Sequence, residues 1–508
     1  MNIRSPLLLG VLCALALAES ARADHLEIHH LEGGTLGGML MVHLHGDPGA
    51  PYLLVASPTT GPVTIQGFQL EVDLSWFPLT TSIPGMSGTF SPGGDAHVHV
   101  PLPLVAAWDT KKVFLQAIRL DAQNPSRIQR VSNAAHFTLG LYQSLQDTGA
   151  TQFPHGLSGL SLIHQHHALI AGGGAGSWLS PIGSDRAEIW DPRTEAFHVT
   201  TSLNTARSLH TQTALGESLQ YEALIAGGIS SSQGVLSSAE VYQPSGSVFR
   251  TTGAMTTPRY GHTSAQLADG RVLIIGGASQ FSGTVTGRAS TAIASTEIWD
   301  PVGDDFTGAA TMSEPRFGAS AIRLSSGKVL VAGGLTLRNG TPTVSDTAEL
   351  YDPGSGQFET PVSMGTARFG ASLALLPDGN VLVAGGYTGD PNSPSATAST
   401  ELFNIFSDSF APTGSLNQAR GFGSLVALPS GPIIAIGGAT GSLVNPTPVG
   451  QVEQYLHSSG AWTTLSQPIS HPRAFAGALD VGHGKVLVAG GLGINRIPQT
   501  AGELFFGK

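Results

Sequence analysis

The sequence has little that could form covalent cross-links or attract charged partners. Its only cysteine is Cys13, and charged residues make up 12 % of the 508-residue chain. The net charge of −11 comes without any run of lysine and arginine, so we expect no nucleic-acid-binding surface. Beyond the N-terminus no apolar stretch is long enough to cross a bilayer, so we also expect no membrane span.

The first segment, residues 1–23, has the composition of a secretory signal peptide. Arg4 precedes an apolar stretch at 7–18, and positions 21–23 read Ala-Arg-Ala, which suits cleavage. We therefore predict that the mature protein is secreted, periplasmic or displayed on the cell surface. Cys13 would be removed with this segment, which leaves the mature chain without disulfides or thiolate chemistry.

Glycine is abundant, at 66 residues, and pairs of glycines recur through the last three quarters of the chain. Each pair follows a short apolar run, and the pairs recur roughly every 50 residues, a period typical of stacked or radial repeats. The pairs are Gly172-Gly173, Gly227-Gly228, Gly276-Gly277, Gly333-Gly334, Gly385-Gly386, Gly437-Gly438 and Gly490-Gly491.

Two charged residues recur in register with the glycine pairs. A glutamate follows each pair, with an aromatic residue two positions later. The glutamates are Glu188, Glu240, Glu297, Glu349, Glu401, Glu453 and Glu503. An arginine precedes the first expected strand at Arg207, Arg259, Arg316, Arg368, Arg420 and Arg473. The glutamate recurs in all seven copies and the arginine in six. Because a residue that recurs so regularly is needed by the repeated unit, we interpret both types as structural residues that pair with each other or with buried backbone groups.

Each copy contains four short segments of strand character, which is typical of one propeller blade. A double glycine followed by two spaced aromatics resembles the kelch repeat, and the resemblance covers about residues 141–508. It implies an all-β fold, a seven-bladed kelch-type β-propeller. The last copy ends at Lys508 before its fourth strand, and residues 142–153 are similar to that strand in other copies. We therefore predict that 142–153 complete the last blade and close the ring.

Residues 24–140 show β alternation without the repeat, which predicts a β-sandwich-like N-terminal domain. His43 and His45 lie two positions apart, as do His97 and His99, so each pair shares one face of a strand, a spacing that metal sites use. No carboxylate or cysteine lies at a suitable sequence spacing from them. We therefore predict no metal and no cofactor, with His43 and His45 as the candidates should a metal bind.

The loops between the second and third strands of the repeats vary in length and are rich in Ser, Thr, Gly and Pro. Variable loops on a rigid scaffold commonly carry binding residues. The candidate ligand-binding residues in these loops are Trp178, Arg186, Phe281, Arg288, Arg338, Tyr387, Asp390 and Arg496. The loops contain no close carboxylate pair, no histidine beside a nucleophile and no phosphate-binding glycine motif, so we predict no catalytic residue.

These observations favour an exported, non-catalytic binding or scaffold protein that holds a protein or carbohydrate ligand on its loop face. The kelch resemblance also implies an alternative, because kelch propellers include copper-radical galactose oxidases and sialic-acid mutarotases. The oxidases require a cysteine cross-linked to tyrosine, which the mature chain lacks. A carbohydrate-active enzyme such as a mutarotase or epimerase therefore stays open, as does a surface or matrix component with the N-terminal domain as a spacer.

Overall fold

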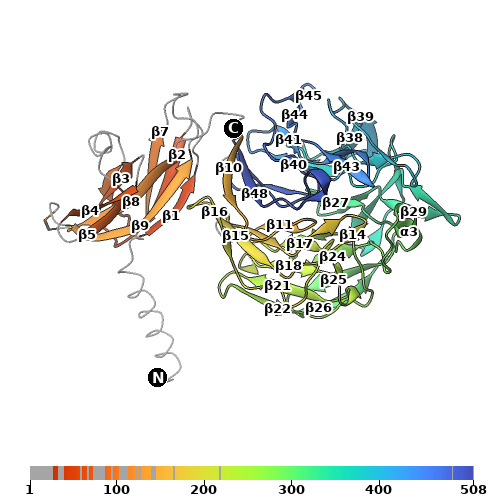
Figure 1. The fold of residues 1–508 in the computed structure, drawn as a ribbon, viewed down its shortest axis with the longest axis horizontal. Helices are drawn as coiled ribbons and strands as arrows, with labels where there is room; N and C mark the ends of the chain where they lie inside the picture. The colour runs from red at the N-terminus through yellow and green to blue at the C-terminus, as the bar shows by residue number, and fades with distance from the viewer. Residues whose placement is uncertain are drawn as a thin grey trace, which may run out of the picture. The chain divides into compact units, whose positions relative to one another are not determined.

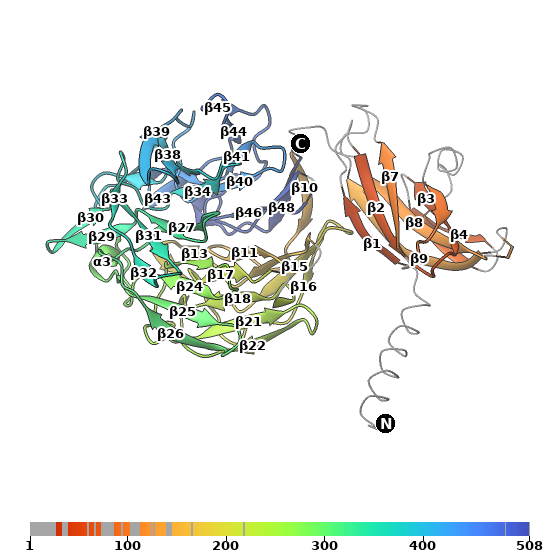
Figure 2. The same cartoon turned by 180° about the vertical axis from the view of Figure 1, so that it is seen from behind.

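The computed structural model describes residues 27–32, 39–57, 60–65, 68–72, 86–92, 95–101, 112–121, 123–124, 128–138, 145–163, 166–216, 219–482 and 484–506. These residues form an all-β protein with very little helix (Figures 1 and 2). The chain divides into two compact units, Met1–Tyr142 with Pro192–Glu195 and Gln143–Asp191 with Ala196–Lys508. The expected signal peptide lies outside the described residues. Within the described residues, no helix has the length and apolar character needed to cross a membrane.

The described part of the second unit contains seven antiparallel sheets of four or five strands, one for each repeat. The first three sheets are β11 (Gly159–Leu162), β12 (Ala168–Ala171), β15 (Ala187–Asp191) and β16 (Ala196–Val199); β17 (Thr211–Ala214), β18 (Ala223–Ala226), β21 (Ala239–Gln243) and β22 (Val248–Thr251); and β23 (Thr263–Gln266), β24 (Val272–Ile275), β25 (Thr296–Asp300) and β26 (Asp305–Ala309).

The next three sheets are β27 (Ser320–Arg323), β28 (Val329–Ala332), β31 (Thr347–Asp352) and β32 (Gln357–Phe358), with β33 (Val362–Ser363) also paired to β31; β34 (Ser372–Leu375), β35 (Val381–Ala384), β38 (Thr400–Asn404) and β39 (Ser409–Pro412); and β40 (Ser424–Ala427), β41 (Ile433–Ile436), β44 (Glu453–Leu456) and β45 (Ala461–Thr464). The second strand is buried along its whole length in the first six sheets, because it has neighbours on both edges and both faces. In the seventh sheet it is buried except at its first residue, Lys485.

The seventh sheet joins the two ends of the second unit. It contains β46 (Gly477–Asp480), β47 (Lys485–Ala489), β48 (Ala501–Phe506) and, as its outer strand, β10 (Leu145–Ala150). β10 runs antiparallel to β48, with Leu145 opposite Phe505 and Ala150 opposite Ala501. The early strand therefore occupies the place that the fourth strand takes in the other sheets.

One kind of backbone hydrogen bond links each sheet to the next. The amide of the second glycine of each pair donates to the carbonyl at the arginine position of the following copy. The bonds run from Gly173 to Arg207, Gly228 to Arg259, Gly277 to Arg316, Gly334 to Arg368, Gly386 to Arg420, Gly438 to Arg473 and Gly491 to His155, at 2.8–3.0 Å. The last bond leads back to the first sheet, and β46 and β11 are neighbours as well.

This link explains why the paired positions are glycines. Both members of every pair have a positive φ, which side chains disfavour. At Gly333, where φ is +67°, an added Cβ would lie 2.1 Å from the carbonyl oxygen of Arg368 in the next sheet. The motif therefore marks the place where consecutive sheets come closest.

The loops between the second and third strands have local structure of their own. Five of them hold two-stranded hairpins in the described chain: β13 (Gly176–Ser177) with β14 (Ser180–Pro181), β19 (Ile229–Ser230) with β20 (Gly234–Val235), β29 (Leu335–Arg338) with β30 (Thr341–Val344), β36 (Tyr387–Thr388) with β37 (Ser395–Ala396), and β42 (Ala439–Ser442) with β43 (Asn445–Pro448). The others hold the helix α3 (Val285–Ser290) and the 3-10 turn η4 (Ile494–Arg496).

The described part of the first unit contains three sheets. They are β1 (Glu27–Glu32), β2 (Met39–His45) and β7 (Asp95–Pro101); β6 (Ser87–Thr89), β3 (Pro51–Ser57), β8 (Lys112–Leu120) and β9 (Ile128–Thr138); and β4 (Thr60–Ile65) with β5 (Phe68–Val72). An apolar cluster of Val55, Leu70, Ile118 and Ile128 connects the larger sheet with β5. All strands shown for this unit are antiparallel to their neighbours.

Candidate functional site

The repeated arginine and glutamate form a buried ion pair in six sheets. The pairs are Arg207–Glu240 (2.7 Å), Arg259–Glu297 (2.6 Å), Arg316–Glu349 (2.9 Å), Arg368–Glu401 (2.5 Å), Arg420–Glu453 (2.6 Å) and Arg473–Glu503 (2.8 Å). Each arginine also donates to the carbonyl of the first glycine of its own copy, as Arg207 does to Gly227 at 2.8 Å. Burial lowers the pKa of Arg207, and the charge of Glu240 opposes that shift. These residues hold the sheets together.

Sequence reasoning found no arginine for the first copy, and the structure shows His155 in its place. The Nε2 atom of His155 lies 3.1 Å from Glu188 Oε1, and its Nδ1 atom lies 2.9 Å from the carbonyl oxygen of Gly172. The imidazole is fully buried and makes the same two contacts as an arginine elsewhere. The signal was present in the sequence, because His155 stands at the position that the arginines occupy relative to the glycine pair.

A ring of backbone surrounds the centre of the second unit. Its members stand two residues after the arginine position and have φ between 53° and 64°. They are Leu157, Leu209, Gly261, Gly318, Gly370, Phe422 and Phe475. The amide of each member from Leu209 onward donates to the carbonyl of the member before it, at 2.8–3.3 Å. This ring brings the starts of the innermost strands together, so the residues that follow it line a common space.

That space is a cavity of about 410 Å³, which we call the axial cavity. Its wall is formed by Ser158, His210, Thr211, Gln212, His262, Thr263, Ser264, Ala319, Ser320, Ala321, Ala371, Gly423 and Ala476, together with members of the backbone ring. Hydroxyl and imidazole groups come from the second and third sheets, whereas the later sheets contribute mainly small side chains. None of the described lining residues is Asp, Glu, Lys or Arg.

Trp178 forms the floor of the axial cavity. It lies at the tip of the β13–β14 hairpin and is only 4 % exposed. Its ring lies 5.4 Å from that of Phe422, and it stacks on Phe475 at 6.4 Å with an interplanar angle of 19°. Behind it, apolar residues of the loops form one buried cluster. The loop face is therefore closed at its centre by packed aromatic side chains.

Two histidines of the cavity wall are uncharged at neutral pH. His210 and His262 stand three residues after the arginine position, where three later copies have alanine. Burial, with a smaller contribution from the charge of Arg207, lowers the pKa of His210 to about 3. Burial and the charge of Arg259 lower the pKa of His262 well below its usual value. The hydroxyl of Thr211 lies 3.0 Å from His262 Nε2 and completes a neutral polar wall.

Three of the predicted loop-face residues are buried, which corrects the expectation that they face a ligand in solvent. Trp178 forms the cavity floor, and Arg288 lies behind it, fully buried, with its guanidinium 4.2 Å from the Trp178 ring. Burial lowers the pKa of Arg288 to about 10. Tyr387 is also buried and donates to the carbonyl of Ala439 at 3.3 Å. Cation–π and aromatic contacts make these side chains part of the packed centre.

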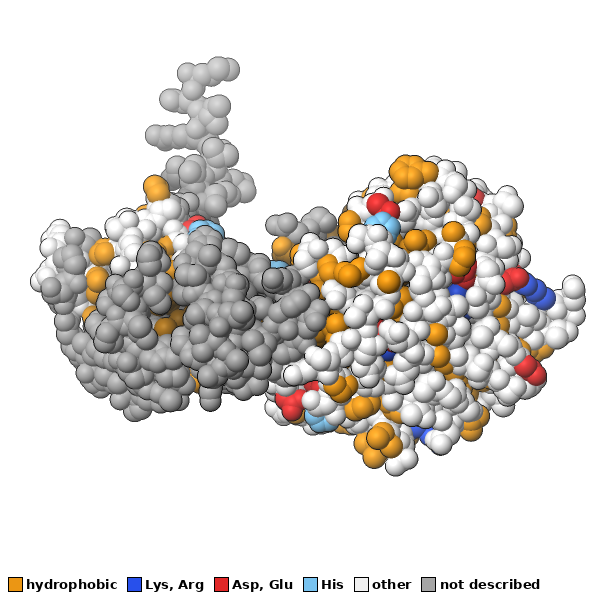
Figure 3. Space-filling model, turned by 90° about the horizontal axis from the view of Figure 1, so that it is seen from above, with side chains coloured by type: hydrophobic (Ala, Val, Ile, Leu, Met, Phe, Trp, Pro, Cys, Tyr) orange, Lys and Arg blue, Asp and Glu red, His pale blue; other side chains and the backbone are white. Residues whose placement is uncertain are grey.

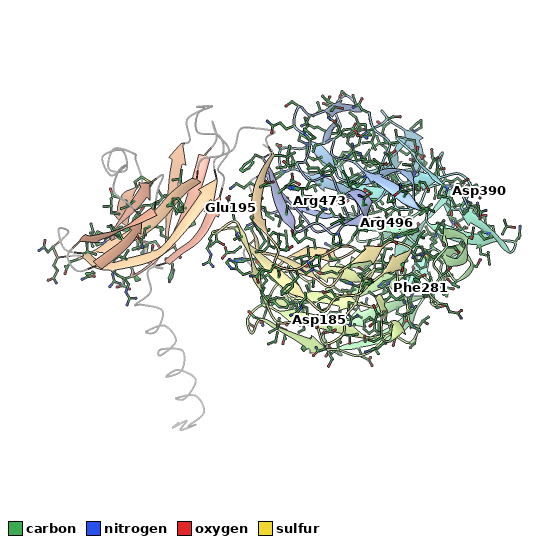
Figure 4. All side chains as sticks on the ribbon, in the orientation of Figure 1. Asp185, Glu195, Phe281, Asp390, Arg473 and Arg496 are labelled. Carbon is green, nitrogen blue, oxygen red and sulfur yellow. The ribbon has the colours of Figure 1, made fainter. Side chains whose placement is uncertain are left out.

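The remaining loop candidates do not come together. Phe281, Arg186, Asp390 and Arg496 are exposed, and Figure 4 shows that Phe281, Asp390 and Arg496 are well separated. Arg338 is held by two carboxylates, with its Nε 3.0 Å from Glu314 and an Nη 2.7 Å from Asp346. On the side of the second unit that Figure 3 shows, charged side chains are few and scattered. Among the described residues the exposed loop candidates therefore do not form one charged site, and the charges around Arg338 neutralise one another.

The histidines singled out in the first unit lie on β2. The register places His43 opposite His97 of β7, and the side chain of His43 is outside the described residues. His45 Nδ1 lies 2.9 Å from Asp95 Oδ1. The expectation that no carboxylate stands near these histidines is therefore wrong, because a partner 50 positions away in the sequence is brought alongside by strand pairing.

The sheets and the repeated motif fit a kelch-like propeller. No family model and no curated protein matches the chain. Among solved structures, a fungal alcohol oxidase of the AA5 family in complex with copper is 18 % identical, with a TM-score of 0.52 over 72 % of this chain and 76 % of that one. The structure of YjhT is 15 % identical, with a TM-score of 0.48 over 62 % of this chain and 99 % of that chain.

The likeness to the oxidase concerns the fold alone. Its copper finds no equivalent donor set here, because the described lining of the axial cavity supplies two imidazoles and no thiol, phenol or carboxylate. The lining of the axial cavity is therefore made of neutral hydrogen-bonding and aromatic groups, without the donors of that copper site.

Proposed function

We propose that residues 141–508 form a closed seven-bladed propeller of an exported protein, and that this propeller binds a carbohydrate in the axial cavity without altering it. The observation that carries the proposal is the combination of an aromatic floor with an uncharged wall of hydroxyl and imidazole groups. The seven sheet-to-sheet hydrogen bonds support the closed ring. The predicted signal peptide supports export.

The cavity has the size and chemistry that a neutral sugar requires. Its volume of about 410 Å³ falls in the range of about 300–1,000 Å³ that is usual for small-molecule sites. Sugar hydroxyls need partners that both donate and accept, which Thr211, Thr263 and Ser264 provide. The C–H faces of a sugar ring need an apolar surface, which Trp178 and Phe475 provide.

Binding without turnover is consistent with the lowered pKa values of the two histidines in the cavity wall. General acid–base catalysis works best when the pKa of the catalytic group lies near the operating pH. A pKa of about 3 keeps His210 neutral, so it cannot deliver a proton at neutral pH. The alternative, a mutarotase or epimerase on the same fold, requires an acid and a base at the ligand, and the described lining supplies neutral hydrogen-bonding groups instead.

A glycan-array screen of the mature chain tests this proposal. The informative variant is Thr211→Val, which keeps the shape of the side chain but removes the hydroxyl that lies 3.0 Å from His262. We expect saturable binding by the wild type and about tenfold weaker binding by the variant, since a lost hydrogen bond in a buried site costs about 1–1.5 kcal/mol. The matched control is Phe281→Ala on the exposed loop, which should bind normally.

Each alternative predicts a different result. Loss of binding in Phe281→Ala but not in Thr211→Val would indicate that the ligand binds on the exposed loops and not in the axial cavity. Interconversion of the bound sugar's anomers or epimers, measured by NMR, would favour the enzyme. Absence of binding to any glycan would contradict the carbohydrate ligand and direct the search to a protein partner.

A further inference from the structure

The seventh sheet of the second unit brings one histidine and two carboxylates together. Asp147 lies on β10, Glu503 lies on β48, and His471 lies in the loop before β46. Their potential ligand atoms all lie within 4.8 Å of one another. His471 Nδ1 is 3.7 Å from Asp147 Oδ1 and 3.8 Å from Glu503 Oε2. Imidazole nitrogen and carboxylate oxygen are both groups that bind Zn²⁺ in proteins.

The carboxylate of Asp147 departs from the repeated pattern. In five other sheets the residue opposite the repeated glutamate on the fourth strand is uncharged. These residues are Val199, Thr251, Gly308, Pro412 and Thr464. In the seventh sheet Asp147 is directly opposite Glu503. Because like charges that are directly opposite destabilise a sheet, a cation between these two carboxylates would stabilise it.

Two of the three ligand atoms have capacity for a further partner. His471 Nδ1 is buried and has no hydrogen-bond partner in the described chain, since both carboxylates lie beyond hydrogen-bond distance. Glu503 Oε2 accepts from Arg473 at 2.8 Å. The equivalent oxygen, Glu240 Oε1, accepts from the amide of Thr205 in addition to its arginine. The oxygen of Glu503 therefore keeps an acceptor position that is filled in the second sheet.

We propose that Asp147, His471 and Glu503 bind one Zn²⁺ ion. Two ligand atoms that are each about 2.1 Å from a tetrahedral Zn²⁺ lie about 3.4 Å apart. The observed separations of 3.7 and 3.8 Å therefore require only small side-chain movements. An imidazole ligand favours a transition-metal ion over Mg²⁺ and Ca²⁺, which prefer oxygen ligands. Asp147 is exposed and His471 partly exposed, so an ion can enter and water can complete its coordination.

The guanidinium of Arg473 weakens this site without blocking it. A carboxylate has several lone pairs, so Glu503 can accept from Arg473 and still bind a metal ion. Hydrogen bonds to ligating carboxylates are usual around metal ions in proteins. The charges of Asp147, Glu503 and Arg473 sum to one negative charge, which attracts a cation less strongly than two free carboxylates would. We therefore expect micromolar rather than nanomolar binding.

The ion would connect strands from opposite ends of the second unit. β10 precedes the first sheet in the sequence, whereas β48 is the last strand of the seventh, and the two are neighbours in Figure 1. An ion that binds only the paired strands stabilises the folded protein by mass action. None of the three ligand residues lines the axial cavity, so this proposal is independent of carbohydrate binding.

Zinc titration of the full mature chain tests the proposal. The metal-stripped protein is titrated with Zn²⁺ by calorimetry at about pH 8, where an ordinary histidine is neutral. The variants are His471→Gln, Asp147→Asn and the control His457→Gln, because His457 contacts a single carboxylate, that of Asp378, at 2.9 Å. We expect the wild type and the control to bind Zn²⁺ equally. His471→Gln and Asp147→Asn should bind it at least tenfold more weakly, and Zn²⁺ should raise their melting temperatures less.

Three results would contradict the proposal. The first is Zn²⁺ binding by His471→Gln and Asp147→Asn that is as tight as in the wild type. The second is a loss of binding in His457→Gln alone, and the third is wild-type binding no tighter than millimolar. Because Asp147 is exposed, Asp147→Asn should fold normally, as circular dichroism will show. This variant decides the outcome if His471→Gln does not fold.

Discussion

In the second unit, the residues of the ion-pair network repeat from sheet to sheet, whereas the residues that line the axial cavity do not. The arginine–glutamate pairs occur in six sheets with nearly the same geometry, and His155 with Glu188 takes their place in the first sheet. The cavity wall is not repeated, since His210 and His262 stand where other copies have Ala319 or Ala371. Residues that repeat hold the sheets together, and residues that depart from the repeat give the cavity its chemistry.

The largest effect should come from breaking one repeated pair. Arg259→Ala leaves Glu297 buried and without its guanidinium, and also removes the bond to the Gly276 carbonyl. We expect a loss of about 3–5 kcal/mol in the free energy of unfolding, measured by urea denaturation. The control is Arg271→Ala, which breaks an exposed pair with Asp269 and should cost about 0–1 kcal/mol. Equal losses in the two variants would contradict the structural role of the repeated pair.

The buried cavity histidine should make the fold sensitive to acid. Above pH 6.5 His210 is neutral in both the folded and the unfolded protein, so it contributes no pH dependence. As the pH falls from 6.5 toward its folded pKa of about 3, the unfolded chain binds a proton that the folded protein does not, and stability is lost. Between pH 6.5 and 4.5 the wild type should lose about 2–3 kcal/mol more than His210→Gln.

This prediction is checked by urea denaturation of both proteins across that pH range. The two variants are compared at pH 7.5 first, so that the packing change is subtracted. If the free energies of unfolding of the wild type and His210→Gln fell in parallel below pH 6.5, His210 would take up its proton in the folded protein as readily as in the unfolded chain. The statement that the cavity wall is neutral would then be wrong.

A smaller effect is expected where two sheets meet. Gly333→Ala places a Cβ against the carbonyl of Arg368 at a positive φ and should destabilise the protein by about 1–3 kcal/mol. The matched control is Gly340→Ala, because Gly340 has φ +76° but no heavy atom within 4 Å of an added Cβ. It measures the backbone term alone. If Gly340→Ala were as unstable as Gly333→Ala, the close approach of consecutive sheets would not be the reason for the glycine pairs.

The repeated part of the fold could be predicted from the sequence because its requirements are local. The positive φ at Gly333 allows little but glycine, and the buried position of Glu297 requires a charged partner. The same two restrictions apply in every copy, so the same residues recur at a regular spacing in the sequence. The same reasoning missed His155, since one histidine replaces an arginine only in the first copy. A search by position rather than by residue type would have found it.

The candidate sites were much less predictable. Trp178 stands in a loop, and nothing local indicates that its ring turns inward to form a cavity floor. The predicted place of residues 142–153 brings Asp147 to the last sheet, but nothing local indicates that His471 turns its Nδ1 atom toward it. A sequence pattern predicts the backbone conformation and the burial of residues within one segment. Both sites are formed by residues from segments that are distant in the sequence.

The most direct measurement is a crystal structure of the mature chain with a sugar that binds in the array. We expect electron density for the sugar in the axial cavity, over Trp178 and within hydrogen-bond distance of Thr211. Density beside Phe281 or Asp390 on the outer loops, with an empty cavity, would contradict it.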